Sequence, residues 1–337
     1  MSDKIIIPAE WETQKCIWTC WPSAHDLWED NINGARAEIG TMIKSIIAPS
    51  NKNKTPVKLL VATDEAYQNA QDCLPNEVEL HLIPFGDIWL RDTGPIFAKN
   101  NNQEIALCFG FNGWGGKYEL EFDDCVNINL ANAAKAIALN NNFILEGGSI
   151  DGNGKGVFLT TKQCLLNKNR NPNLSQTQIE KIMFDDLGAK QILWLEDGLL
   201  NDHTDGHIDN IARFIGENKI ICQSPFGDDD PNFIVLNKIY DDLCAMRNLD
   251  GSPFEIVRAP SPGLVKNQDG EIVPASHMNF IITNGAVVMP HYGTKSADLA
   301  LKILAEHFPN HEIIGINATY TLSGGGSFHC ITQQQPL

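Results

Sequence analysis

The chain has 337 residues, of which 43% are hydrophobic and 20% charged, and its formal net charge is −17 at pH 7. This length and composition are typical of a globular protein with a substantial core, and they exclude a disordered or fibrous chain. The negative charge disfavours nucleic acid and anionic membranes as partners and suits a small cationic substrate, although a solvated acidic surface is the commoner cause of such a charge.

The amino-terminal residues give no targeting signal. Residues 1–8 (MSDKIIIP) lack a basic segment followed by an apolar stretch and a cleavage site, and no apolar run reaches transmembrane length. We therefore expect a cytoplasmic location. The nine cysteines include no Cys-x-x-Cys pair, which is typical of neither a disulfide framework nor a structural zinc site. We expect them to be reduced.

Five segments of the chain share one pattern, a polar turn with glycine or serine followed by apolar strands. The turns lie at residues 91–95, 146–149, 205–209, 276–279 and 324–327. The first four are followed by predicted hairpins at residues 96–109, 149–166, 211–223 and 280–291. The fifth has room for one strand only, and the strand predicted at residues 15–20 would supply its partner and close a ring.

Helical patterns separate these segments, at residues 33–47, 126–139, 175–187, 231–246 and 295–308. Ser175 and Gln178 form a capping box at the start of the third. Each helix precedes a short predicted strand, at residues 57–62, 143–145, 191–195, 254–257 and 312–316. Five such units predict one α/β domain over residues 1–337, arranged around an axis.

The polar turns carry residues that could act together. Asp92, Glu146, His207, His277 and Cys330 follow one another at intervals of 53 to 70 positions, one in each unit. If every unit points its turn at the axis, these side chains meet in one central pocket.

The residue types in the turns indicate a thiol nucleophile acting on a cation. The run Gly324 to Gly326 leads to Cys330, and glycines are used where a positive φ or a close backbone approach is needed. A thiol needs a base or a lowered pKa to attack, and a histidine such as His207 needs a third group to orient it. Asp209, two residues after His207, lies on the same face of a strand, so carboxylates are left to bind a planar charged group.

Each of these residues also has a purely structural interpretation. Asp92 could form a turn, Glu146 could cap a helix, and His207 could be a satisfied core histidine. Cys330 could be a buried free thiol in a closing strand. Their joint occurrence at equivalent positions of repeats favours the functional interpretation.

The remaining aromatic and histidine residues are less informative. Trp89 and Trp114, near glycine turns, are more often core residues than ligand-stacking ones. His329 should point away from Cys330 on any strand there and is assigned a structural role. His203 and His277 remain unassigned candidates for the pocket or its rim.

Six motifs resemble one known family. They are WLRDTGP (89–95), FNGWGG (111–116), LEGGSI (145–150), TKQCLLNKNRNP (161–172), TDGHID (204–209) and GGGSFHCITQQQP (324–336). Together they are similar to the agmatine deiminases, in the bacterial peptidylarginine-deiminase branch of the guanidine-modifying superfamily. The resemblance runs from PAEWE (8–12) to the end of the chain.

The resemblance implies a pentein-like, five-bladed α/β propeller and a hydrolase acting on linear amidines. The implied reaction converts agmatine to N-carbamoylputrescine and ammonia, a step in putrescine biosynthesis. By matching motif, Cys330 is the nucleophile, His207 the acid and base, Asp92 and Asp209 the guanidinium clamps, and Glu146 the partner of His207. No cofactor and no metal are implied.

The resemblance also indicates which residues contact substrate. Besides the two aspartates, these are Trp89, Trp114 and Gly325. The chain departs from the family at Asp151, which could change the rim of the pocket, and at His203. A homo-oligomer is compatible with the sequence.

Other functions remain open at this level. Within the superfamily the substrate could be free arginine or peptidyl-arginine, or the amidine could be transferred to an amine. Arg91, Arg170 and Arg213 each have a structural explanation, so no receptor for the α-carboxylate of arginine is evident and agmatine is favoured.

Two further classes lie outside the superfamily. A metal-dependent amidohydrolase could use His203, His207 and Asp209 as ligands. A non-catalytic propeller that binds polyamines would keep the acidic pocket without using Cys330.

Overall fold

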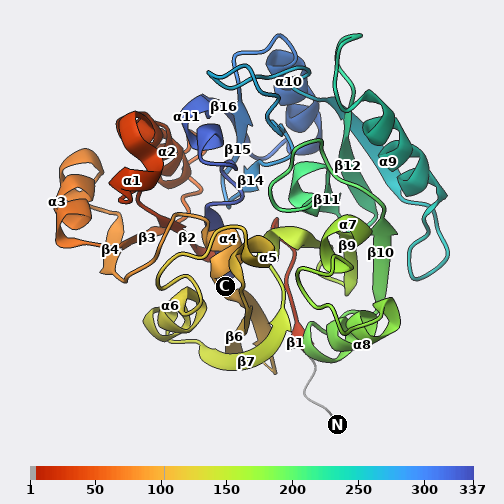
Figure 1. Ribbon diagram of the computed structural model, residues 1–337, viewed down its shortest axis with the longest axis horizontal. Coiled ribbons are helices and arrows are strands. Elements are labelled where there is room, and N and C mark those ends of the chain that lie inside the picture. Colours follow the sequence, from red (N-terminus) through yellow and green to blue (C-terminus); the bar gives the residue numbers. More distant parts are fainter. Residues whose placement is uncertain (1–4, 102) are drawn as a thin grey trace.

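Five small sheets surround a central axis in the computed structural model, which describes residues 5–101 and 103–337 (Figure 1). The first sheet has the order β1 (Ile5–Ile6), β5 (Ile96–Asn100), β6 (Gln103–Gly110), β7 (Ile137–Ile144). The second is β10 (Gln191–Leu195), β9 (Val157–Thr161), β8 (Ile150–Gly152), and the third is β11 (Ala212–Gly216), β12 (Lys219–Ser224), β13 (Glu255–Pro260). The fourth is β14 (Ile281–Ile282), β15 (Ala286–His291), β16 (Glu312–Asn317), and the fifth is β17 (Thr332–Pro336), β2 (Gln14–Cys20), β3 (Val57–Val61), β4 (Glu79–Leu82).

One pairing rule repeats in all five sheets. Two strands pair antiparallel, and the second of them then pairs parallel with a third strand, as in β5, β6 and β7 or in β11, β12 and β13. A short turn suffices for an antiparallel pair, whereas a parallel pair needs a longer crossover, usually through a helix. The predicted succession of hairpin, helix and strand is therefore confirmed as a five-bladed α/β propeller.

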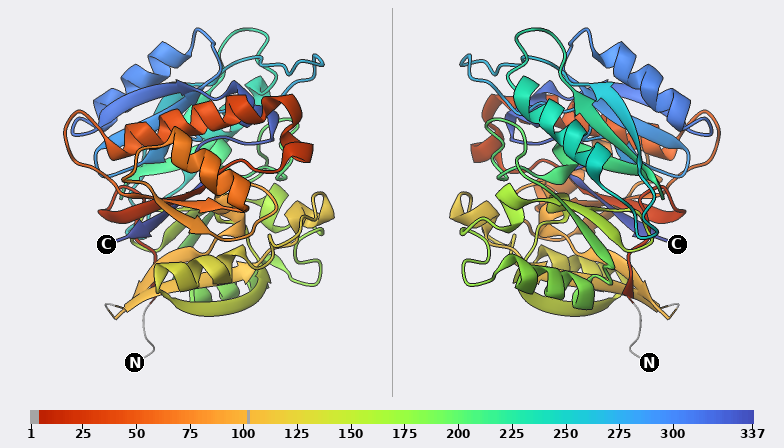
Figure 2. Two further views of the ribbon diagram at one scale, coloured as in Figure 1. Left: turned by 90° about the vertical axis from the view of Figure 1, so that its left-hand side faces the viewer. Right: turned by 90° about the vertical axis from the view of Figure 1, so that its right-hand side faces the viewer.

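The helices that make the crossovers lie at the outer edge of the ring (Figures 1 and 2), and two of the short helices, α4 (Leu90–Thr93) and α5 (Gly113–Gly116), lie near the axis in Figure 1. The longer ones are α2 (Ile32–Ile47), α3 (Asp64–Cys73), α6 (Val126–Ala134), α8 (Gln176–Asp186), α9 (Phe233–Ala245) and α10 (Ala297–His307). The short ones are α1 (His25–Trp28), α4 (Leu90–Thr93), α5 (Gly113–Gly116), α7 (Lys162–Leu165), α11 (Thr319–Ser323) and the 3₁₀ turns η1 (Glu29–Asn31), η2 (Gly147–Ser149) and η3 (Ile208–Asn210). Within residues 5–101 and 103–337, no helix is long and apolar enough to cross a membrane.

The ring closes between the two ends of the chain, as the sequence predicted. Strand β17 pairs antiparallel with β2, with Thr332 opposite Thr19 and Gln334 opposite Ile17. The capping box of α8 is also confirmed, because the Ser175 side chain accepts from the Gln178 amide while the Gln178 side chain accepts from the Ser175 amide.

The helix predicted at residues 126–139 is too long. Helix α6 ends at Ala134 because Lys135 adopts a left-handed conformation with φ of 59°. Residues from Ile137 then extend as β7, the edge strand of its sheet, so the strand predicted at residues 143–145 starts six residues earlier than expected. Glycine is the usual signal for such a helix end, and a lysine there gives none.

The second hairpin and the segment that follows β3 also differ from expectation. Strand β9 ends at Thr161, whose side chain caps α7, so the hairpin predicted to reach residue 166 is shorter. Helix α3 and strand β4, absent from the prediction, extend the fifth sheet beyond β3. The turn of the hairpin predicted at residues 96–109 includes Asn102, which lies outside the described residues. Residues 1–4, part of the amino-terminal segment in which no targeting signal was found, also lie outside them.

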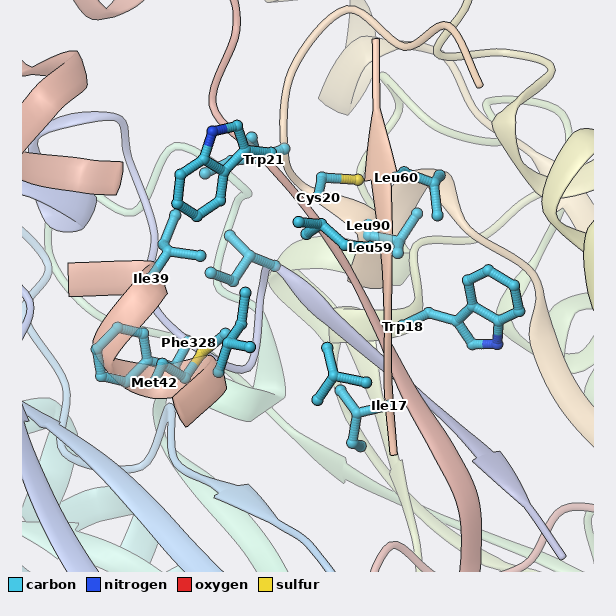
Figure 3. Packing of buried hydrophobic residues seen from close by; sticks show 14 of the residues in the cluster. Ile17, Trp18, Cys20, Trp21, Ile39, Met42, Leu59, Leu60, Leu90 and Phe328 are labelled. Atoms are coloured by element: carbon cyan, nitrogen blue, oxygen red, sulfur yellow. The ribbon is translucent and has the colours of Figure 1, made fainter. Parts of the chain in front are cut away.

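The largest apolar cluster lies between α2 and the fifth sheet. Ile39 and Met42 of α2 lie on one side of β2, and Trp18 of β2 lies on the other (Figure 3). All three side chains are fully buried. A strand buried on both faces has no need of polar alternation, which explains the nearly continuous apolar sequence CIWTC in β2.

A set of buried charges ties the blades together at the axis. The Arg213 guanidinium donates to Glu10, to Asp151 Oδ2 at 2.5 Å and to the carbonyl oxygens of Met278 and Phe280 at 3.2 and 2.9 Å. These partners come from the amino-terminal segment and the second and fourth units. Arg213 and Glu10 both lie out of water, so each needs the opposite charge of the other.

We predict that Arg213→Met lowers the free energy of unfolding by about 3–5 kcal/mol, because it leaves Glu10 and Asp151 buried without their cation. Urea denaturation followed by circular dichroism measures the change. The matched control is Lys219→Met, which removes the partly exposed pair with Glu255 and should cost less than about 1 kcal/mol. Equal losses in the two variants would contradict this account.

Candidate active site

A pocket of about 260 Å³ opens between segments of several units, and the glycine turn of residues 324–326 forms part of its wall. Turn η2 contacts both helix α4, which lies near the axis in Figure 1, and turn η3, so that the first three units are joined there. The residues that line the pocket are Leu27, Trp28, Asp87, Trp89, Asp92, Trp114, Tyr118, Leu120, His203, Thr204, Ser323, Gly324, Gly325, Gly326 and Cys330.

The three glycines before Cys330 are required by their surroundings. Gly325 has φ of 114°, a conformation that side chains disfavour. A Cβ at Gly324 would lie 2.5 Å from the Trp28 ring, and one at Gly326 would lie 2.6 Å from the Trp89 ring. The glycine turn therefore lies directly against two indoles and leads Cys330 to the pocket, as the sequence predicted.

The Cys330 sulfur has polar neighbours on two sides. Asn279 Nδ2 lies 3.0 Å from Sγ, and Asp209 Oδ2 lies 3.8 Å away. Burial, together with the negative charges of Asp209 and Asp92, raises the pKa of the Cys330 thiol well above its ordinary value. These surroundings favour the thiol, and a cation bound beside the sulfur would favour the thiolate.

Asp209 is held by a histidine next to the cysteine. His329 Nδ1 lies 2.7 Å from Asp209 Oδ2, and His329 Nε2 lies 3.2 Å from Glu10 Oε2. Burial alone would raise the pKa of Asp209, but the hydrogen bond and charge of His329 outweigh it and lower that pKa. His329 therefore lies in a turn and binds Asp209, rather than facing away on a strand. The contact with Asp209 gives a specific content to the structural role assigned to His329.

Asp92 is fixed from two sides within the pocket. The Gly148 amide donates to Oδ1 at 2.9 Å, and Trp114 Nε1 donates to Oδ2 at 2.9 Å. Burial raises the pKa of Asp92, a shift that His207 opposes and Asp209 increases. The carboxylate lies at the pocket wall, where a cation in the pocket can reach it.

His207 lies just below Asp92, with Nδ1 3.8 Å from Asp92 Oδ2. Burial opposes its protonation, but the charge of Asp92, with Cys164 and Glu146 nearby, raises the pKa of His207 well above its ordinary value. Gly148 makes room for the ring, because a Cβ there would lie 2.6 Å from His207 Nδ1. Neither ring nitrogen has a hydrogen-bond partner of good geometry among the described residues.

Glu146 has a partner that the sequence analysis did not identify. Arg170 Nε donates to Glu146 Oε1 at 2.6 Å, and Arg170 Nη1 donates to Asp205 Oδ2 at 2.6 Å. The other oxygen of Glu146, Oε2, has no hydrogen-bond partner in the described part of the chain. Glu146 lies near His207, since a carboxylate oxygen, a His207 nitrogen and the Cys164 sulfur all lie within 4.8 Å of one another.

The fourth turn contributes a different residue from the one expected. His277 does not line the pocket; its Nδ1 lies 3.0 Å from the Pro260 carbonyl oxygen, and burial lowers its pKa to about 4. Asn279 of the same turn instead reaches the Cys330 sulfur. The sequence indicated the turn, but it did not indicate which of the two residues, Asn279 or His277, contacts Cys330.

Two other expectations need correction. Asp151 does not lie at the pocket rim, because it is paired with Arg213 in the buried axial network. Arg91 does point away from Asp92, but from helix α4 rather than a strand, and it donates to Gln333 and Gln334.

Aromatic residues form the outer wall of the pocket. Trp114 packs edge-on against Tyr118, and the Tyr118 hydroxyl lies 2.9 Å from His203 Nδ1. His203 therefore lies at the rim. No arginine or lysine is among the described residues that line this pocket. Lys117, at its edge, contacts Asp205 and the His203 carbonyl oxygen.

The metal ligands considered above do not gather. The group of described residues able to hold an ion is Glu146, Cys164 and His207, without His203 or Asp209. The triad of His203, His207 and Asp209 is thus wrong as a ligand set.

Known proteins resemble the chain over almost its whole length. The family described as Porphyromonas-type peptidyl-arginine deiminase matches residues 6–336. An agmatine deiminase of Pseudomonas putida is 34% identical over 366 residues, covering 99% of this chain and 96% of that protein. The solved agmatine deiminase of Enterococcus faecalis has a TM-score of 0.92 at 31% identity, covering 99% of this chain and 96% of that one.

A second solved structure, a C. jejuni agmatine deiminase with a cysteine replaced by serine and substrate bound, has a TM-score of 0.89 at 33% identity and covers 98% of this chain and 96% of its own. These similarities span the five units and the turns that form the pocket. The chain belongs to the Porphyromonas-type peptidyl-arginine deiminase family.

Proposed function

We propose that this protein is an agmatine deiminase, which hydrolyses the guanidinium group of agmatine to a ureido group and releases ammonia. The observation that carries the proposal is the grouping of a buried thiol, Cys330, with two carboxylates. Asp92 lines the same pocket as Cys330, and Asp209 Oδ2 lies 3.8 Å from the sulfur. The agmatine deiminases of P. putida and E. faecalis, similar over nearly the full chain, support it.

The first step is binding of the planar cation. Asp92 and Asp209 accept hydrogen bonds from the guanidinium nitrogens, which orients the central carbon toward Cys330. Asp209 Oδ1 has no hydrogen-bond partner in the described structure and is available for this contact. Trp89, Trp114 and the Gly325 backbone form the surrounding wall.

The substrate itself activates the nucleophile. In the free protein, burial and two carboxylates raise the pKa of Cys330, so the thiolate is disfavoured until a positive charge arrives. A guanidinium held against Asp92 and Asp209 supplies that charge and stabilises the thiolate, and the thiol proton passes to solvent. Attack on the central carbon then gives a tetrahedral adduct.

His207 acts in both halves of the reaction. Its raised pKa keeps it protonated, so it donates a proton as ammonia leaves and an S-alkylthiouronium forms on Cys330. Neutral His207 then accepts a proton from water, which attacks the same carbon and expels the thiolate. The negative charge of the nearby Glu146 also favours the protonated form of His207.

The far end of the substrate determines which guanidine fits. A site for arginine must neutralise an α-carboxylate, normally with a basic residue. The described lining of this pocket offers Asp87 and Asp92 but neither arginine nor lysine. An amine at the far end therefore suits the pocket better than an amino acid does.

Cys330→Ala should lower kcat roughly 10⁴-fold or more, because no other described thiol lines the pocket. Ammonia release from agmatine measures the loss, and mass spectrometry of acid-quenched wild-type protein should find an adduct on Cys330. The matched control is Cys222→Ala, which changes another buried thiol away from the pocket and should stay active. An adduct on another cysteine would refute the assignment.

Glu146 and His207 should act as a coupled pair. His207→Ala is expected to lower kcat by about 10²–10⁴-fold. The Glu146→Gln substitution should lower kcat much less in the His207→Ala variant than in the wild-type protein, with an interaction energy of roughly 1–3 kcal/mol. Asp205→Asn is the control, because it disturbs the same Arg170 without touching His207. If the double variant loses the product of the single effects, Glu146 does not act through His207.

Agmatine should be processed at least ~100-fold better than arginine by kcat/KM, about 2.7 kcal/mol, the size expected for one unpaired buried charge. Arginine methyl ester separates charge from bulk, since it keeps the α-substituent and loses the negative charge. It should recover part of the efficiency. Comparable efficiency on arginine would overturn the choice of substrate and leave the role of Cys330 intact.

A further inference from the structure

We infer that Glu146, Cys164 and His207 form a binding site for a soft divalent cation such as Zn²⁺, and that the ion inhibits the enzyme. Cys164 has no part in the reaction proposed above. The site differs from a catalytic metal centre because the ion would occupy groups that the reaction needs free. Inhibition rests on the proposed function, whereas binding of the ion does not.

The three side chains converge in a buried space below the pocket. One potential ligand atom from each, a carboxylate oxygen of Glu146, the Cys164 sulfur and a ring nitrogen of His207, lies within 4.8 Å of the other two. All three residues are fully buried. A cysteine, a histidine and a glutamate provide the sulfur, nitrogen and oxygen ligands that Zn²⁺ binds in proteins.

Glu146 offers a free lone pair in this space, and His207 offers one once its ring loses a proton. Arg170 occupies Oε1 of Glu146, but Oε2 has no hydrogen-bond partner in the described structure. The His207 ring nitrogens have no partner of good geometry there, and the Cys164 thiol is the polar side chain that interacts with the ring. Buried polar atoms without partners are rare and need a reason. A coordinated ion would satisfy the carboxylate and the imidazole at once.

The local backbone holds Cys164 in place for such a role. Thr161 caps helix α7 by accepting from the Cys164 amide at 3.2 Å, and the Thr161 hydroxyl donates to the Gly206 carbonyl oxygen at 2.7 Å. Gly206 directly precedes His207. The cap thus links the segment that carries the thiol to the segment that carries the imidazole.

Coordination requires only a small movement. Zinc ligands lie at about 2.0–2.3 Å from the metal, so ligand atoms up to 4.8 Å apart must draw together by on the order of 1 Å. On binding, the S–H bond of Cys164 and one N–H bond of the protonated His207 ring break, both protons pass to solvent, and sulfur–metal and nitrogen–metal bonds form. Water fills the fourth position.

Charge favours entry of a cation through the substrate pocket. Asp92 lines the pocket and lies 3.8 Å from His207, and Asp209 lies beside Cys330. Among the described residues outside the ligand group, Arg170 contacts it with a positive charge, and that charge is shared with Asp205. An ion that binds His207 and Glu146 would remove the proton carrier from the reaction.

Cobalt tests the site directly, because Co²⁺ bound to a thiolate gives a sulfur-to-metal charge-transfer band. Titration should use Cys330→Ala as the parent, which removes the nucleophile as an alternative ligand. We expect one equivalent of Co²⁺ to produce the band in this parent and Zn²⁺ to displace it. Cys330→Ala with Cys164→Ser, which keeps size and polarity but removes the sulfur, should lack the band.

Cys222→Ser in the same parent is the matched control, a buried cysteine outside the ligand group that should leave the band unchanged. A band that persists in the Cys164→Ser variant, or none in the parent, overturns the inference. A band found in wild-type protein but lost in the parent assigns the ion to Cys330 and also overturns it. If Cys164→Ser does not fold, His207→Gln in the parent replaces it and should weaken cobalt binding at least ~10-fold.

Inhibition is measured on protein with Cys330 intact. Zn²⁺ should inhibit ammonia release from agmatine, a chelator should restore it, and Cys164→Ser should need at least ~10-fold more Zn²⁺ for the same fractional loss. Equal sensitivity of the two proteins would overturn the inhibitory role. A protein that releases no ammonia from agmatine even without metal would refute the proposed function, and the cobalt titration would still decide the metal site.

Discussion

The structure depends on balancing charges that the fold removes from water. Five units that point their turns at one axis bury several ionisable groups there, and a buried charge is costly unless it is paired. Arg213 is shared by Glu10 and Asp151, and Glu10 in turn contacts His329. Because these partners come from different units and from the amino-terminal segment, the charge network also joins the blades.

The same constraint explains the chemistry of the pocket. On the side of the axis that faces the pocket the balance is incomplete: Asp92 has a raised pKa, Cys330 is held as a thiol, and Asp209 Oδ1 has no partner among the described residues. A guanidinium ion supplies the missing positive charge and the missing donors together. Binding and activation of the thiol are then one electrostatic event, and a neutral ligand of the same shape would achieve neither.

Small residues make these close contacts possible. Gly148 allows the His207 ring and two carboxylates to lie around one backbone position, and Gly326 allows Trp89 to lie against the cysteine turn. A side chain at either position would move a wall of the pocket by more than the tolerance of a reacting geometry. The glycine-rich turns therefore serve packing as much as conformation.

The sequence by itself determined the repeat and the types of side chain at its turns. A repeated pattern can be recognised within short segments, so the five units and the closing strand of residues 15–20 could be predicted. Of the turn residues expected in one pocket, Asp92 and Cys330 line it. Asp209 lies beside Cys330, whereas Glu146 and His207 do not line the pocket. The end of α6 could not, because Lys135 takes a glycine-like conformation without a glycine.

Only the tertiary structure decided which side chains touch. Asn279, and not His277, lies beside Cys330, and Glu146 accepts a hydrogen bond from Arg170. It also moved Asp151 from the expected rim to the axial network. These contacts join residues far apart in sequence, and their choice follows from desolvation and charge balance around the axis, which no local pattern records.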